Sequence, residues 1–170
     1  VQTCALPIWE WYGSIFNLLK QQFFLTMPIT NQTFDGGVNL YCGMLAVFTA
    51  FLYIFTGKIN VWEKIKNILL LTILAVSFNS TTLNYIWHGF HNQYGIPNRF
   101  SFLFIFILLV MTYETIRRAR GIHVIFIVGA FLISIAYMVL CSMEADEHLT
   151  KKVLTASIIM LSLYTIIFLM

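Results

Sequence analysis

Long apolar runs separated by short polar connections constrain the fold of this chain more than any other feature. A helix needs about 20 apolar residues to cross the roughly 30 Å hydrocarbon core of a bilayer. Five segments reach or approach that length, at about residues 38–55, 65–78, 100–116, 122–141 and 153–170. We therefore predict an all-α fold, a polytopic transmembrane helical bundle with about five membrane spans over residues 38–170.

The composition agrees with a membrane location. Hydrophobic residues make up 59% of the chain and charged residues only 10%, whereas about 25% of the residues of a soluble domain are charged. The net charge of +3 comes from Lys and Arg residues that are spread along the chain, so we expect no nucleic-acid partner. Membrane lipids are the expected surroundings.

The first eight residues, VQTCALPI, differ from the rest. They hold neither an initiator Met nor a basic region before an apolar core, so they do not resemble a signal peptide. They read like the in-frame translation of a sequencing adapter, and we interpret residues 1–8 as an artefact of that kind. The chain also stops at Met170 inside an apolar run, and we therefore interpret it as a fragment truncated at both ends.

Basic residues in the connections predict the orientation in the membrane. The short connections after the first and third predicted spans together hold six of them, namely Lys58, Lys64, Lys66, Arg117, Arg118 and Arg120. By the positive-inside rule, both connections face the cytoplasm. Segments 9–37 and 79–99 are then expected on the outside of a bacterial cytoplasmic membrane.

Residues 11–25 have the period of an amphipathic helix. Tyr12, Phe16, Leu19 and Phe23 recur at steps of four, three and four, which places them on one helical face. We expect an outer interfacial helix here, with its apolar side in the membrane interface. The alternative is a helix that packs this side against its own protein, because the period does not identify what the apolar face contacts.

The connection LNYIWHGFHNQYGIPNRFSF, at residues 83–102, gathers unusual polar chemistry between two apolar runs. Non-helical backbone is not tolerated bare in hydrocarbon, so this loop is expected at headgroup depth or in a protein-lined cavity. Pro97 disfavours helix before it, and Asn98 is a candidate cap for the next span. Arg99 is then near the amino end of a membrane helix, where a guanidinium and backbone amides favour phosphate. Alternatively, the Arg99 side chain only extends to the interface between membrane and water and binds no phosphate.

Two histidines in this loop are further candidates. His88 and His91 are three residues apart, so they would share a face on a helical turn. A purely structural role is the first interpretation of the two histidines, and hydrogen bonding to a sugar or phosphate, or acid–base work, is the functional alternative. A divalent metal is not expected, because further ligands such as Asp35 or Glu144 would have to approach in space.

Several stretches resemble the bacterial YfhO family of large membrane proteins, mostly between residues 36 and 116. The resemblance rests on GGVNLYCGMLAVFTAFLYIF, on VWEKIKN and on the loop with the following helix, LNYIWHGFHNQYGIPNRFSFLFIFILL. The matching positions are Asn39, Tyr41, Gly43, Glu63, Lys64, His88, Gly89, Phe90, His91, Pro97, Arg99, Phe100 and Phe102.

The resemblance implies a partial GT-C type fold and a glycosyltransferase. Such an enzyme moves a sugar from a polyprenyl-phosphate donor to a cell-envelope polymer, such as a teichoic acid, on the outer face of the membrane. In this interpretation the donor site is formed by Arg99 as phosphate clamp, His88 and His91 as secondary donors, and Asn84, Tyr94 and Asn98 as sugar contacts. No cofactor is implied besides the lipid-linked sugar.

The resemblance places the catalytic base, an acidic residue, in the first outer loop, upstream of this segment, so the segment alone is expected to be inactive. Asp35 is the one candidate within it for a base or a metal ligand. A polytopic transporter and a non-catalytic scaffold are the alternative functions. A transporter is disfavoured because residues 101–112 and 124–141 contain no ionisable side chain at mid-membrane depth.

Overall fold

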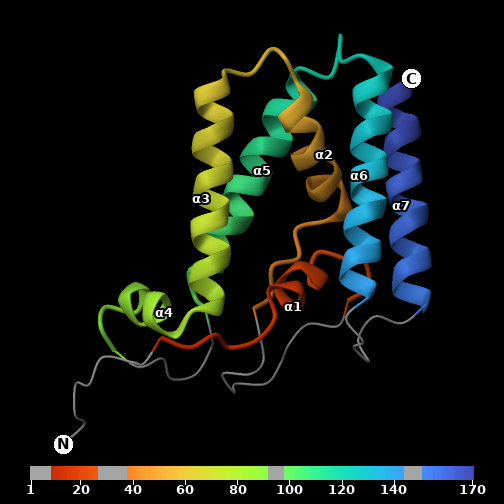
Figure 1. Ribbon diagram of the computed structural model, residues 1–170. Coiled ribbons are helices and arrows are strands. Elements are labelled where there is room, and N and C mark those ends of the chain that lie inside the picture. Colours follow the sequence, from red (N-terminus) through yellow and green to blue (C-terminus); the bar gives the residue numbers. More distant parts are fainter. Residues whose placement is uncertain (1–8, 27–37, 92–97, 144–150) are drawn as a thin grey trace, which may run out of the picture.

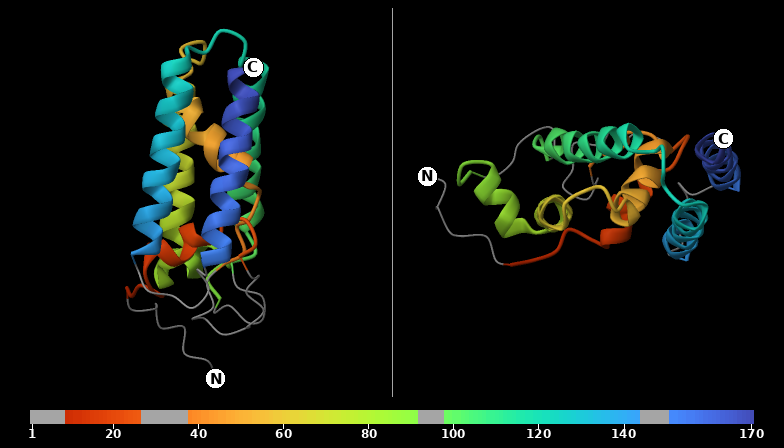
Figure 2. Two further views of the ribbon diagram at one scale, coloured as in Figure 1. Left: turned by 90° about the vertical axis from the view of Figure 1, so that its right-hand side faces the viewer. Right: turned by 90° about the horizontal axis from the view of Figure 1, so that it is seen from above.

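Seven helices make up the described part of the computed structural model, which covers residues 9–26, 38–91, 98–143 and 151–170. They are α1 (Ile15–Lys20), α2 (Met44–Phe55), α3 (Val61–Asn79), α4 (Thr81–Trp87), α5 (Ser101–Arg117), α6 (Val124–Ser142) and α7 (Lys151–Leu169). Helices α2, α3, α5, α6 and α7 form a bundle, and the short α1 and α4 lie at one end of it (Figures 1 and 2). The predicted all-α class is confirmed, since the described residues hold no strand and only an isolated bridge.

Helices α6 and α7 are long and apolar enough to cross a membrane. Each has 19 residues, and the mean hydropathy of their apolar windows is 2.7 and 2.0. Only 28% and 22% of those windows are buried inside the protein. The core helix of a soluble protein is mostly buried, so the open apolar surface of α6 and α7 is suited to contact with lipid.

The described residues thus contain two helices that are long and apolar enough to span a membrane, fewer than the five spans that we predicted. Helix α2 has 12 residues, about 18 Å at 1.5 Å per residue, and α5 has 17. Helix α3 has 19 residues, but its first two turns carry the charges of Glu63, Lys64 and Lys66. Helix α2 also starts later than the predicted residue 38, because Gly43 has a φ of 101°, outside the helical region.

Helix α2 is the centre of the bundle, in contact with α5, α6 and α7. Its buried side chains join two apolar clusters, one shared with α3 and α5 and the other with α6 and α7. Buried hydroxyls connect α2 to α5: the Oγ1 atoms of Thr49 and Thr112 are 2.8 Å apart, and Thr115 Oγ1 donates to the Thr49 carbonyl (3.3 Å). Hydroxyl pairs of this kind typically hold membrane helices together.

Residues 11–25 do not form the single amphipathic helix that we predicted. The helix is limited to Ile15–Lys20, because Ser14 is extended and its Oγ caps the Phe16 amide (3.3 Å). Phe23 is fully buried, and the hydroxyl of Tyr137 donates to the Leu19 carbonyl (2.7 Å). The structure therefore favours the alternative, in which the apolar side packs against its own protein.

The two basic connections meet at one end of the bundle. The ammonium of Lys58, between α2 and α3, donates to the carbonyl of Arg120, between α5 and α6 (3.0 Å). Helices α1 and α4 lie at the opposite end (Figure 1). The two basic connections therefore lie at the same end of the bundle, and α4 lies at the other end.

Candidate functional site

Helix α4 follows α3 without a linker, because Ser80 ends one helix and starts the other. Its backbone is extended, with φ −103° and ψ 125°, and its amide donates to the Val76 carbonyl (3.0 Å). Its Oγ accepts from the Leu83 amide at 3.4 Å, the contact of a helix N-cap. The chain turns at Ser80, so α4 projects to one side at the end of α3, away from α6 and α7 (Figure 1).

Residues 10–13 brace this junction. The Thr81 amide donates to the Glu10 carbonyl (3.1 Å), the Tyr12 amide donates to the Asn79 carbonyl (2.9 Å), and the Asn79 side-chain amide donates to the Gly13 carbonyl (2.7 Å). Burial raises the pKa of Tyr12 above its usual value. Sequence reasoning missed this brace, because a single bridge between Trp11 and Ser80 leaves no periodic pattern.

His88 closes the end of α4. Its Nδ1 atom lies 2.8 Å from the Asn84 carbonyl, and since a carbonyl only accepts, Nδ1 carries the proton. The Nε2 atom is then the acceptor of the neutral ring. The expectation that His88 and His91 share a helical face is wrong, because Gly89 and Phe90 have φ values of 67° and 62°.

A stack of three aromatic rings connects α4 to the core of the bundle. Phe78 of α3 stacks on Phe100 with ring centroids 4.8 Å apart, and Trp87 stacks on Phe100 at 5.0 Å. Phe78 and Phe100 are buried, whereas Trp87 is 44% exposed. The ring of His88 meets Phe100 edge-on at 6.0 Å. The stack fixes the end of α4 beside the start of α5.

Asn84 and Asn98 join the two ends of the loop. The side-chain amide of Asn84 donates to the side-chain oxygen of Asn98, and both residues are buried. Asn98 is therefore not the predicted side-chain cap: Phe100 is the N-cap residue of α5, and Asn98 offers only its carbonyl, to the Ser101 amide (2.9 Å). Asn98 has a φ of 52°, a left-handed conformation that Asn tolerates better than most residues.

Arg99 follows Asn98 at the amino end of α5, and it is exposed. The structure records no ion pair between Arg99 and a carboxylate of the described residues. His91 is exposed as well. The end of α4 and the start of α5 thus bring Asn84, His88 and Asn98 together around Phe100, with Arg99 next in the chain. Tyr94 and Asp35 lie outside the described residues, and so does Glu144.

Polar side chains next to α1 are buried, which the sequence analysis did not predict. Lys20 and Gln22 are only 3% and 4% exposed. The Lys20 ammonium donates to Asn17 Oδ1 (3.3 Å), and the Gln22 amide donates to the Leu40 carbonyl (2.6 Å). Gln22 thereby satisfies non-helical backbone before α2, as membrane proteins require. Within the described part of the chain, no group of three or more His, Cys, Asp or Glu side chains gathers as a metal site.

Comparison with known proteins identifies a family. No curated protein and no solved structure matches the chain. The family described as bacterial membrane protein YfhO matches residues 9–170. The open apolar surface of α6 and α7 agrees with that description. Since the match covers nearly the whole chain, this chain belongs to the YfhO family of bacterial membrane proteins.

Proposed function

We propose that this chain is part of a membrane glycosyltransferase of the GT-C type. The enzyme takes a sugar from a polyprenyl-phosphate donor and attaches it to a cell-envelope polymer, such as a teichoic acid, on the outer face of the membrane. The bundle crosses the membrane about five times, with α2, α3 and α5 beside α6 and α7. The observation that carries the proposal is the exposed Arg99 at the amino end of α5, beside α4.

The geometry around Arg99 supports a phosphate site. Phe100 makes no side-chain hydrogen bond as the N-cap residue of α5, and the first-turn amides of Ser101 and Leu103 donate to the carbonyls of Asn98 and Phe100. The positive end of the helix dipole and the guanidinium of Arg99 attract an anion. The donor phosphate gains negative charge when its bond to the sugar breaks, and fixed positive groups stabilise that charge. Arg99 is the clamp for the phosphate. The Nε2 atom of His88 accepts from a hydroxyl group of the lipid-linked sugar, and His91 donates a further hydrogen bond to this ligand.

The other polar residues take supporting roles in this proposal. Asn84 and Asn98 bind each other, so they hold the two ends of the loop in position and offer the sugar only what remains of their hydrogen-bonding capacity. Trp87 presents an exposed ring on which the apolar face of a sugar packs. Tyr94 is a further sugar contact, and Asp35 is a candidate base. The main catalytic base, an acidic residue, belongs to an upstream part of the protein, so this segment alone is inactive.

The orientation follows from the charges at the two ends. Six basic residues face the cytoplasm. They lie in the α2–α3 and α5–α6 connections, in the first turns of α3 and at the end of α5. Arg99 and α4 are then outside, at the depth of lipid headgroups in the outer leaflet. A transporter is a weaker proposal, because the buried hydroxyls of α5, α6 and α7 are bonded within the protein. Those of Thr112, Thr115, Ser134 and Thr165 donate to carbonyls of their own helices, and that of Ser157 accepts from the Phe24 amide.

The test is an Arg99→Ala variant of the complete protein. We expect donor binding about 10- to 100-fold weaker, the loss typical of hydrogen bonds to a charged group, and envelope glycosylation reduced with it. The matched control is Arg117→Ala, which removes an exposed arginine from the opposite end of the same helix. Glycosylation in cells and donor binding to purified protein are the readouts. Unchanged glycosylation in Arg99→Ala at normal protein levels would exclude Arg99 from the site.

A further inference from the structure

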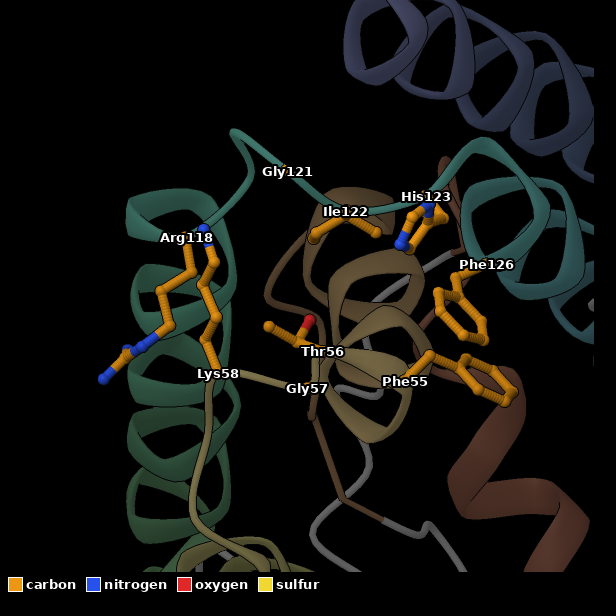
Figure 3. Close-up of a pocket in the computed structure, with 9 residues that line it drawn as sticks. All are labelled: Phe55, Thr56, Gly57, Lys58, Arg118, Gly121, Ile122, His123 and Phe126. Carbon is orange, nitrogen blue, oxygen red and sulfur yellow. The ribbon is translucent and has the colours of Figure 1, made fainter.

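A small pocket opens at the end of the bundle opposite α4. It has a volume of about 250 Å³ and lies between the α2–α3 and α5–α6 connections (Figure 3). Its apolar walls are formed by Phe55, Ile122 and Phe126, with Phe55 and Phe126 stacked at a centroid distance of 5.8 Å. Its polar lining is Thr56, Lys58, Arg118 and His123. Sites for drug-sized ligands measure about 300–1,000 Å³, so this pocket suits a smaller group.

Lys58 is held at the rim of the pocket. Its ammonium donates to the Arg120 carbonyl (3.0 Å), which occupies one of its three N–H donors. A Cβ at Gly121 would lie 3.1 Å from this ammonium, so the glycine leaves the space in which it sits. Gly121 also has a φ of 101°, a conformation that L side chains rarely adopt. The cation is therefore positioned before any ligand binds, with donors left for an anion.

Arg118 contributes less to the pocket than Lys58 does. Its guanidinium pairs with the carboxylate of Glu114 on the same helix, and Figure 3 shows it pointing away from Ile122 and His123. The ring of His123 meets that of Phe126 edge-on, at a centroid distance of 6.1 Å. The polar groups that remain available to a ligand are thus the Lys58 ammonium and the His123 ring, which lie next to the apolar walls of the pocket.

The charge of this end is strongly positive. The two connections and the adjoining helix ends carry six basic side chains and two acidic ones, Glu63 and Glu114. A cation beside an apolar wall matches an amphipathic anion, whose charge meets the ammonium and whose hydrocarbon meets the aromatic rings. Basic pockets between membrane helices on the cytoplasmic side are typical sites for anionic lipid headgroups.

We propose that this pocket binds the phosphate headgroup of an anionic phospholipid from the leaflet at this end of the bundle. Lys58 contacts the phosphate, His123 hydrogen-bonds to the phosphate or glycerol oxygens, and the first carbons of the acyl chains pack on Phe55 and Phe126. The site is separate from Arg99 and does not depend on the glycosyltransferase proposal.

The experiment uses the complete protein in phosphatidylcholine vesicles with spin-labelled phosphatidylglycerol or phosphatidylcholine as probe. The wild type is expected to prefer the anionic probe. Lys58→Gln should reduce that preference about fivefold, as expected for one cation near a membrane surface. Glutamine keeps a donor for the Arg120 carbonyl, and Lys58→Arg should restore the preference, which separates loss of charge from loss of fold.

The matched control is Lys66→Gln, which removes an exposed lysine from the same end outside the pocket lining. It should keep most of the preference. Equal losses in Lys58→Gln and Lys66→Gln would overturn the proposal in favour of general electrostatic attraction. Inorganic phosphate, added at constant ionic strength, should not displace the lipid probe. Displacement that depends on Lys58 would assign the pocket to a free phosphate and overturn the lipid assignment.

Discussion

Asn84 and Asn98 hydrogen-bond through their side chains across 14 residues of chain, and both are buried at 2% and 5% exposure. Asn84 belongs to α4 and Asn98 immediately precedes Arg99. This pair therefore fixes the start of α5 relative to α4. The position of the proposed phosphate clamp depends on two amides that sequence spacing alone did not connect.

Replacing Asn84 by Ala should lower the free energy of unfolding by about 1–3 kcal/mol, because the Asn98 oxygen is left buried without its donor. The double variant Asn84→Ala, Asn98→Ala should lose less than the sum of the two single variants. Unfolding of the purified protein by heat or denaturing detergent measures both. Strictly additive losses would contradict a direct bond between the two side chains.

The orientation predicts which end of the bundle reagents reach from outside. In a protein without its native cysteines, His91→Cys on intact cells should react with a membrane-impermeant maleimide, since His91 is exposed on the α4 side. Gly57→Cys should react only after permeabilisation. Gly57 is an apt control because it is exposed and a Cβ there meets nothing within 4 Å. The reverse labelling pattern would invert the proposed topology.

Trp87 should distinguish sugar binding from carrier binding. Trp87→Ala should weaken binding of the glycosylated polyprenyl phosphate severalfold, because the exposed ring offers a large apolar contact. Binding of the sugar-free polyprenyl phosphate should change little, whereas Arg99→Ala should weaken both. Trp62→Ala is the control, since Trp62 is 77% exposed at the other end. An equal effect of Trp87→Ala on both ligands would remove the ring from the sugar site.

Two glycines should respond oppositely to the same substitution. A Cβ at Gly89 or at Gly129 meets no atom within 4 Å, but Gly89 has a φ of 67° whereas Gly129 lies inside α6. Gly89→Ala should destabilise the protein by about 1 kcal/mol through its backbone alone. Gly129→Ala should be neutral or stabilising by up to about 1 kcal/mol. Thermal unfolding of the two variants gives the comparison, and destabilisation by Gly129→Ala alone would contradict the assigned conformations.

The longest apolar runs were the most predictable part of the fold. Helices α6 and α7 lie close to the predicted spans 122–141 and 153–170, because an uninterrupted apolar stretch leaves few alternatives to a helix in lipid. The late start of α2 was not predictable, since a glycine permits a φ of 101° but does not require it. The Gln22 side chain donates to the Leu40 carbonyl in the non-helical segment before Gly43, and this contact between distant residues could not be foreseen from the sequence.

The candidate site was predicted as a group of residues but not as a geometry. The polar loop indicated Arg99 and His88, and the structure leaves Arg99 exposed and orients His88 through the Asn84 carbonyl. The role of Asn98 was misassigned, because a capping pattern is local and its actual partner is a side chain of the preceding helix. Spacing also could not foresee that Gly89 ends the helical path to His91.

The shared residue Ser80 couples α4 rigidly to the tilt of α3, because no flexible linker separates the two helices. Membrane helices adjust their tilt when the hydrocarbon thickness around them changes. In the membrane orientation that we propose, a change in bilayer thickness is therefore expected to move α4 together with α3. The aromatic stack joins α4 to the beginning of α5, so His88 and Asn98 are expected to move together with it.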